Sequence, residues 1–242
     1  MEQVTLVTGA GRRVGACIAE TLAAEGHRLI LHAHRSAVEA RRIARNIERA
    51  GGQVLAVVEA DLTTAQGIEA LLGGLEECPP VTGLVNNAAS FPRATLDRST
   101  PQLVAETIAL NLTAPLQLMR TLHLRGGLRA VVNLLDARAD RAWTERGVYL
   151  ASKAALESLT RTAAQEWAPA TRVNGVALGP VEPEGADAEW GPRHSDAVLG
   201  MLALGRPVRP AEVARVVAML LSEETAGVTG AVWRLDAGRG LR

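Results

Sequence analysis

The chain has 242 residues, of which 48% are hydrophobic and only 2% aromatic, so we expect a sizeable core built from aliphatic side chains. The 26 basic and 26 acidic residues cancel, and this balance disfavours binding to nucleic acid or another polyanion. No apolar stretch approaches the roughly 20 residues of a membrane span. The two cysteines form no metal or redox motif and no signal peptide is evident, so a cytoplasmic protein is expected.

Short apolar runs alternate with helical periodicities from one end of the chain to the other. Strands are predicted at Val4–Val7, Arg28–Ala33, Val54–Glu59, Gly83–Val85, Ala130–Leu135, Arg172–Ala177 and Ala231–Leu235. Helices are predicted at 14–24, 37–50, 64–75, 101–124, 148–167 and 210–221. The apolar runs are continuous, which indicates strands covered on both faces. We therefore expect one α/β domain over residues 1–242, with a Rossmann-like, doubly wound parallel sheet of about seven strands and helices on both faces.

A glycine-rich turn, Thr8–Gly15, follows the first strand and opens the first helix. Gly9 permits a tight turn, and Gly15 permits the helix to pack closely against the strand. The unpaired N–H groups and the positive dipole end of that helix suit a pyrophosphate. The pattern indicates a dinucleotide site, the alternative being a turn with a purely structural role.

The end of the second strand indicates which cofactor binds. An NAD site needs an acidic residue there for the ribose 2′-hydroxyl, and the segment His32–Ser36 contains no carboxylate. Arg35 and Ser36 suit a 2′-phosphate instead, so we predict NADP(H). The alternative is that Arg35 is a surface cation and Ser36 only the N-cap of a helix. No metal site is expected, because no third ligand lies near His32 and His34.

The only tyrosine, Tyr149, and the only lysine, Lys153, lie four residues apart, although arginine supplies the other 25 basic residues. Residues i and i+4 share a helix face, so Lys153 is expected to lower the pKa of Tyr149. A compact ammonium also shares its protons in a tight polar site, unlike a guanidinium. The pair predicts a proton-transfer site, against the alternative of a chance pair on a solvated helix.

Taken in order, these features resemble the short-chain dehydrogenase/reductase family, whose marks cover the whole chain: Thr8 to Gly15, Asp61, Asn86-Asn87-Ala88, Asn111 and Tyr149 with Lys153. The resemblance implies that Tyr149 passes the proton, that Lys153 binds the nicotinamide ribose, and that Asn111 holds a water of the proton relay. It places Asp61 by the adenine, and Asn86 by the adenosine ribose and the neighbouring strand. The residues expected to bind the cofactor are Gly9, Arg12, Arg13, Val14, His34, Arg35, Ser36, Asp61, Leu62, Asn87, Ala88, Tyr149, Lys153, Gly179 and Val181.

Two departures from the family pattern narrow the resemblance. Arg13 replaces the middle glycine of the turn, and Asp136 occupies the position, 13 residues before Tyr149, where the family has a catalytic serine. Both are similar to the pteridine reductases and the bacterial dihydromonapterin/dihydrofolate reductases, as are His34-Arg35-Ser36 and the segment Asn86–Phe91. The resemblance implies NADPH-dependent reduction of a pterin or folate, with Asp136, Tyr149, Lys153 and Asn111 catalytic. The expected substrate contacts are Arg13, Ser90, Phe91, Asp136, Tyr149 and Trp190.

The irregular segment at about 180–205 lies where this fold carries a substrate lid, with Trp190 and His194 as its expected contacts; packing within the lid is the alternative for Trp190. The family also implies a homotetramer, in which Arg242 would reach a neighbouring site. For Asp136, the alternative is a solvated loop carboxylate. Two other functions stay open: a carbonyl reductase of the 3-oxoacyl thioester type, which Asp136 disfavours, and a non-catalytic nucleotide-binding module, which the Tyr149–Lys153 pair disfavours.

Overall fold

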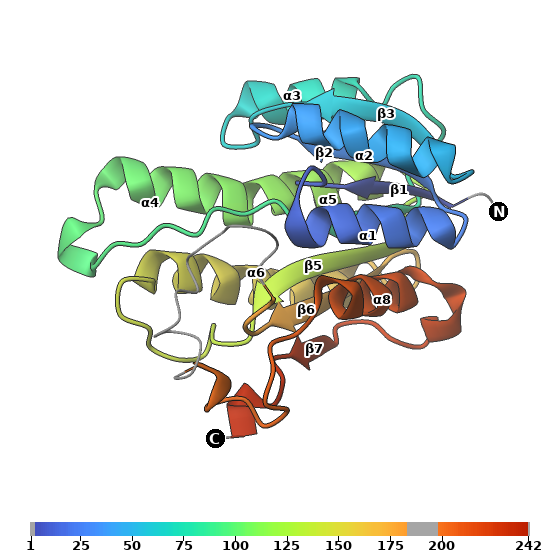
Figure 1. Ribbon diagram of the computed structural model, residues 1–242. Helices are drawn as coiled ribbons and strands as arrows, with labels where there is room; N and C mark the ends of the chain where they lie inside the picture. Colours follow the sequence, from blue (N-terminus) through green and yellow to red (C-terminus); the bar gives the residue numbers. More distant parts are fainter. Residues whose placement is uncertain (1–2, 183–197, 242) are drawn as a thin grey trace.

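A computed structural model describes residues 3–182 and 198–241. A seven-stranded sheet lies at its centre, with helices on both faces (Figure 1). The strands are parallel and run in the order β3-β2-β1-β4-β5-β6-β7. From β1 the chain first winds toward β3 and then, through β4, toward β7, so the winding direction reverses between β1 and β4. Ligands of such sheets bind at the carboxyl edge beside this reversal. The predicted doubly wound parallel sheet is confirmed.

The elements lie where the sequence predicts them, within a few residues. The strands are β1 (Val4–Val7), β2 (Arg28–Ala33), β3 (Gln53–Glu59), β4 (Gly83–Asn86), β5 (Ala130–Asp136), β6 (Arg172–Leu178) and β7 (Val232–Leu235). The α-helices are α1 (Arg13–Ala24), α2 (Ala37–Arg49), α3 (Ala65–Gly73), α4 (Pro101–Ile108), α5 (Ala114–Arg125), α6 (Gly147–Glu166) and α8 (Pro210–Leu221). Within the described part of the chain, no helix is long and apolar enough to cross a membrane.

Two aliphatic layers hold the helices to the sheet. Helices α1, α2 and α8 cover one face, where Ile18 of α1 and Val213 of α8 join a cluster with Leu31 of β2. Helices α3, α5 and α6 cover the other face, where Leu118 of α5 packs in a cluster with Ile30 of β2. Adjacent residues of one strand thus enter opposite layers, as the pleat requires. Burial of each such side chain contributes roughly 1.5–3 kcal/mol.

The helix predicted over Pro101–Leu124 is interrupted. A π-helical turn, Ala109–Thr113, separates α4 from α5, and the fully buried Asn111 lies within it. A π turn inserts a residue into the helical ladder, and such turns are frequent at functional sites. Hydrophobic periodicity does not reveal it, because the apolar face continues on both sides. The interruption aims Asn111 at the loop after β4 and at α6.

Candidate functional site

The glycine turn after β1 forms a close-packed cradle at the carboxyl edge of the sheet. Gly9 has a φ of 66°, in the left-handed region, and a Cβ there would lie 3.0 Å from the Cα of Ala88. A Cβ on Gly15 would collide with the carbonyl oxygen of Gly9. Helix α1 starts with no side-chain cap at Arg12 and no acidic residue in its first turn. The helix N-terminus is therefore suited to an anion.

Arg13 has a backbone conformation that glycine adopts readily and other residues rarely do. Its φ is 51°, which lies in the left-handed region that a side chain disfavours by about 1–2 kcal/mol. By contrast, Arg12 has an extended φ of −151°. The turn thus accepts local strain to place a guanidinium at the start of α1, and such strain is concentrated at functional sites.

Asn87 and His32 support the turn from behind. The Nδ2 of Asn87 donates to the carbonyl oxygens of Thr8 at 2.8 Å and Gly9 at 3.1 Å. The N–H of Gly9 donates to Nδ1 of His32 at 3.3 Å, so Nε2 carries the ring proton and donates to the carbonyl oxygen of Ala60 at 3.0 Å. Burial lowers the pKa of His32, which favours this neutral form. His32 is therefore a structural link between the ends of β1, β2 and β3.

The residues expected around the adenosine lie along the adjacent ends of β2 and β3. Ser36 precedes α2 without a side-chain hydrogen bond to that helix, so its hydroxyl does not cap it. Nδ1 of His34 lies 3.7 Å from Oδ1 of Asp61. Hydrogen bonds from the backbone and side chain of Thr63 lower the pKa of Asp61, which is ionised at neutral pH. The side chain of Leu62 is buried in the core, which leaves only its backbone for the predicted cofactor contact.

Helix α6 and the end of β5 bring the expected catalytic groups together. The Tyr149 hydroxyl donates to Oδ2 of Asp136 at 3.1 Å, while Oδ1 of Asp136 accepts the Arg138 N–H at 2.8 Å. Nζ of Lys153 donates to the carbonyl oxygen of Leu134 at 2.7 Å. Both Tyr149 and Lys153 are buried, at 8% and 4% exposure. Asp136 is thus turned toward the phenol and not into bulk solvent.

The pKa of Tyr149 is raised and not lowered, contrary to what the four-residue spacing predicts. Burial raises the pKa of Tyr149 well above its ordinary value, and the charge and hydrogen bond of Asp136 raise it further. Burial also lowers the pKa of Lys153 to about 8, against the opposing charge of Asp136. A four-residue spacing places the two side chains on one helix face, but it reveals neither their depth nor the acceptor beside the phenol. Tyr149 is therefore protonated at neutral pH.

Asn111 joins the loop after β4 to α6. Its Oδ1 accepts the N–H of Ser90 at 2.8 Å, and its Nδ2 donates to the carbonyl oxygen of Ser90 at 3.0 Å and to Oγ of Ser152 at 3.1 Å. Oγ of Ser152 in turn donates to the carbonyl oxygen of Tyr149 at 2.6 Å. Ser152 is not among the site residues that the sequence predicts. Its signal was that it is the only polar side chain between Tyr149 and Lys153.

An aromatic wall stands beside the phenol. The Phe91 ring meets the Tyr149 ring edge-on, with centroids 4.5 Å apart, and lies 5.6 Å from the ring of Trp143. The guanidinium carbon of Arg146 lies 3.6 Å from the Phe91 centroid, and its Nη1 donates to the Phe91 carbonyl oxygen at 2.7 Å. No pattern in the sequence pointed to Arg146. Phe91 stays 42% exposed, so it offers surface for a planar ligand.

Three more residues that the sequence places near the cofactor, Gly179, Val181 and Asn86, make contacts within the protein. Gly179 donates its N–H to the carbonyl oxygen of Leu235 at 2.8 Å, and a Cβ there would lie 2.6 Å from the Cα of Asp236. Val181 forms an isolated parallel bridge with Val208. Asn86, expected near the ribose, is buried and donates to Oδ1 of Asn133 in β5 at 2.8 Å, so its side chain links two strands. Trp190, His194 and Arg242 lie outside the described residues.

A doubly wound sheet, a glycine cradle at a helix N-terminus and a buried Tyr–Lys pair define a nicotinamide-dependent oxidoreductase. A family model described as enoyl-(acyl carrier protein) reductase matches residues 9–239. The chain belongs to the short-chain dehydrogenase/reductase family, and it is an oxidoreductase of that family.

Three relatives of about the same sequence identity to this chain are named for different substrates. FolM alternative dihydrofolate reductase 1 from Brucella canis, solved with NADP, is 31% identical, with a TM-score of 0.87 over 99% of this chain and 95% of that one. Pteridine reductase 1 from Leishmania tarentolae is 30% identical over 98% of this chain and 96% of its own length. Galactitol 2-dehydrogenase (L-tagatose-forming) from Cereibacter sphaeroides is 34% identical over 96% and 92%. Overall similarity therefore does not select the substrate, which has to be argued from the site.

Proposed function

We propose that this protein is an NADPH-dependent pteridine reductase that converts a 7,8-dihydropterin or dihydrofolate to its tetrahydro form. One observation carries the proposal: a carboxylate, Asp136, takes the position of the family's serine and accepts the hydrogen bond of Tyr149 at 3.1 Å. The similarity to FolM and to pteridine reductase 1 supports it. We infer that Asp136, Tyr149 and Lys153 carry the proton relay, with Asn111 as their support.

The cofactor is NADP(H), and the residues present fit it. Gly9 and Gly15 let the turn pack closely against its neighbours, and the N-terminus of α1, which has no side-chain cap, suits a pyrophosphate. Arg35, which is exposed, and Ser36, whose hydroxyl does not cap α2, follow β2. No carboxylate lies in this segment to repel a 2′-phosphate. Structures similar to this one were solved with NADP or NADPH bound. The residues proposed to hold the cofactor are the ones that the sequence predicts. The side chain of Asn87 supports the glycine turn through its hydrogen bonds to Thr8 and Gly9.

The chemistry needs a hydride at C6 of the pterin and a proton at N5. When bound, NADPH supplies the hydride. Tyr149 is the proton donor, because burial and Asp136 raise its pKa and keep the phenol protonated at neutral pH. Asp136 orients the phenol through Oδ2 and accepts N–H groups of the pterin edge with its remaining lone pairs. A serine hydroxyl offers fewer acceptor sites and no charge.

Lys153 and Asn111 support the donor. The Lys153 ammonium is buried at the end of β5, where its charge stabilises the phenolate that proton transfer leaves behind. Both N–H groups of the Asn111 amide are used on Ser90 and Ser152, so this side chain fixes α6 relative to the loop after β4. Asn111 therefore acts through the position of Tyr149.

The pterin is proposed to stack on Phe91, whose ring is held by Arg146 and Trp143 and is partly exposed beside Tyr149. Oγ of Ser90 is a buried polar atom that has no hydrogen-bond partner within the described residues, as expected of a ligand contact. Arg13 is proposed to face the pterin and the cofactor phosphates. We propose that residues 1–242 form one domain, with a substrate lid at about 180–205 that carries Trp190. We also propose that the protein assembles as a homotetramer.

The test is steady-state NADPH oxidation with dihydrobiopterin, dihydromonapterin, dihydrofolate and an acetoacetyl thioester, compared by kcat/KM. We expect turnover with at least one pterin or folate and little with the thioester. Turnover with the thioester alone would reject the proposal, and no turnover with any of the four would favour a nucleotide-binding module. In the same assay Asp136→Ala should lower kcat more than it weakens NADPH binding, and unchanged pterin turnover would remove Asp136 from the mechanism.

A further inference from the structure

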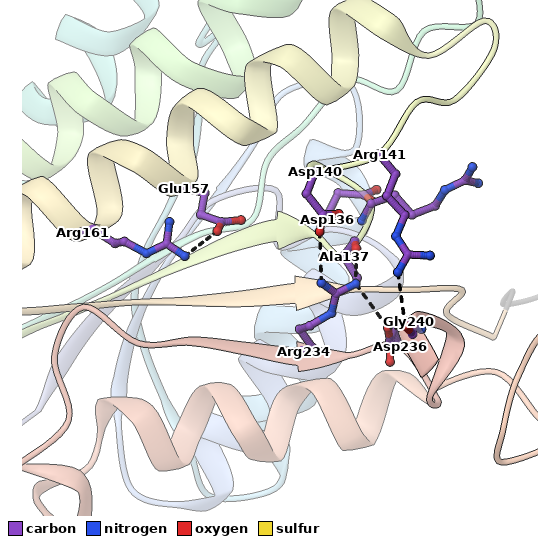
Figure 2. A network of polar contacts seen from close by, with 10 residues as sticks. Asp136, Ala137, Asp140, Arg141, Glu157, Arg161, Arg234, Asp236 and Gly240 are labelled. Carbon is purple, nitrogen blue, oxygen red and sulfur yellow. Dashed lines mark hydrogen bonds and ion pairs between the residues drawn. The ribbon is translucent and has the colours of Figure 1, made fainter. Parts of the chain in front are cut away.

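The last strand of the sheet reaches the loop that follows Asp136. Strand pairing places Asp136 of β5 beside Leu178 of β6, and Leu178 beside Leu235 of β7. Arg234 precedes Leu235, and its side chain extends past β6 toward β5. Its Nη2 donates to the carbonyl oxygen of Ala137, the residue directly after Asp136, as Figure 2 shows. The contact joins residues 97 positions apart in the sequence.

The guanidinium of Arg234 is held by two carboxylates. Its Nη1 lies 3.7 Å from Oδ2 of Asp140, and its Nη2 lies 3.6 Å from Oδ2 of Asp236 (Figure 2). Asp140 is exposed, so this pair is weak. Asp236 is buried at 8% exposure, and its oxygens accept the N–H groups of Gly238 and Gly240, each at 3.0 Å. The buried carboxylate thus fixes both the C-terminal turn and the side of the guanidinium that faces Ala137.

A second contact ties the same two segments. Nη2 of Arg141 donates to the carbonyl oxygen of Gly240 at 3.2 Å, and Gly240 lies in the short 3-10 turn Arg239–Leu241 (Figure 2). The turn after β5 and the turn after β7 are therefore joined at two points, one through Arg234 and one through Arg141. Two separate hydrogen bonds therefore bind the segment that leads from β5 to α6 to β7 and to the turn that follows β7.

The decisive geometry lies in a single peptide unit. The carbonyl of Ala137 and the N–H of Arg138 belong to the same planar peptide group and point in opposite directions. Arg234 binds the carbonyl end, and the N–H end donates to Oδ1 of Asp136 at 2.8 Å. Because the group is rigid, holding its oxygen also orients its N–H. The orientation reaches the phenol through Oδ2 of Asp136, which accepts from Tyr149.

We propose that Arg234 is a positioning residue, which orients the Asp136 carboxylate through the Ala137–Arg138 peptide. Arg234 does not touch the reacting groups in this structure and acts through Asp136. The inference rests on the proposed function only in that Asp136 takes part in the reaction. The effect on the peptide can be measured without any turnover.

The first measurement is amide hydrogen exchange by NMR in the full-length protein. Arg234→Met keeps the length of the side chain and removes its donors. We expect the Arg138 amide to exchange about 2- to 10-fold faster, the range that corresponds to losing one ordinary hydrogen bond, while the amides of β5 stay unchanged. Arg161→Met is the matched control, since Arg161 pairs with Glu157 on the exposed side of α6 (Figure 2).

The second measurement is catalysis. With the pterin that the unaltered chain turns over, Arg234→Met should lower kcat about 2- to 10-fold at unchanged NADPH affinity, and Arg234→Lys, which can still donate to the carbonyl, should restore most of the loss.

Unchanged Arg138 exchange in Arg234→Met would overturn the inference, whatever the activity. Equal losses of kcat and NADPH binding that Arg234→Lys does not relieve would also overturn it, because they indicate general destabilisation. If the unaltered chain turns over no pterin, the proposed function fails, and the exchange measurement alone decides the role of Arg234.

Discussion

The hydroxyl of Tyr149 donates to Oδ2 of Asp136 at 3.1 Å, and this contact adds to burial in keeping the phenol neutral. Because Tyr149 is the only tyrosine in the chain, its ionisation can be followed in the whole protein without interference from another phenol. The carboxylate favours the neutral phenol, both by its charge and by accepting its hydrogen bond.

Asp136→Asn should therefore lower the pKa of Tyr149, since it removes the negative charge and leaves a weaker acceptor. The measurement is tyrosinate absorbance as a function of pH. In the same variant, kcat for pterin reduction should fall about 10- to 100-fold, as expected for loss of a hydrogen bond to a charged group. Asp97→Asn, at an exposed aspartate of the short 3-10 turn Leu96–Arg98, is the control and should leave the titration in place. An unmoved titration in Asp136→Asn would show that burial alone sets the ionisation of Tyr149.

Lys153 predicts an upper pH limit for activity. Its pKa is lowered to about 8 by burial, so the ammonium loses its proton as the pH rises through that value. The charged form is needed to stabilise the phenolate, and kcat/KM for NADPH should therefore level off about one unit below pH 8, reach half its maximum near pH 8 and decline further above it. The pH profile of kcat/KM reports this group in the free enzyme. A profile that stays flat well above pH 9 would contradict the assignment.

Arg35 should decide between the two nicotinamide cofactors. Arg35→Ser removes a charge-assisted contact to the 2′-phosphate, and KM for NADPH should rise roughly 10- to 100-fold, with little change for NADH. Arg41→Ser is the matched control, because Arg41 is an exposed arginine of α2 whose Nη2 pairs with Glu59 at 3.1 Å. Equal effects of both substitutions on NADPH would assign Arg35 to the general surface charge.

Replacing Arg13 by glycine should stabilise the fold and weaken pterin reduction. Arg13→Gly relieves a side chain held at a φ of 51°, and the free energy of unfolding should rise by about 1 kcal/mol despite the added freedom of the unfolded chain. Pterin reduction should weaken, since the guanidinium is lost. Arg12→Gly, at an extended φ of −151°, should instead lower stability by a few tenths to about 1 kcal/mol. Urea denaturation of the two variants makes the comparison, and a loss of stability in Arg13→Gly would mean that contacts of the side chain outweigh the strain.

The sequence predicted the features that repeat along the chain. Continuous apolar runs marked all seven strands, and Gly9 and Gly15 marked the cradle, because each is fixed by local geometry. The position of Asp136, 13 residues before Tyr149, placed the carboxylate near the phenol, and the structure brings the two into contact. Its part in catalysis stays a prediction.

The features that the sequence did not predict depend on how deeply side chains are buried and on contacts between residues far apart in the chain. The π turn around Asn111 leaves the apolar face of its helix intact, so periodicity could not reveal it. The raised pKa of Tyr149 follows from burial, which no spacing measures. Arg234 contacts Ala137 only because β7 lies beside β6 and β6 beside β5, an order that appears once the sheet is assembled.

Lys153 is the single lysine of the chain, and it is almost completely enclosed. Every other positive side chain is a guanidinium, which does not react with acylating reagents. An amine-selective label of small size would therefore modify the α-amino group and, more slowly, the buried side chain of Lys153 in its neutral amine form. The extent of labelling at Lys153 would measure how often this side chain becomes accessible to reagents in the solvent. A bound dinucleotide should lower it.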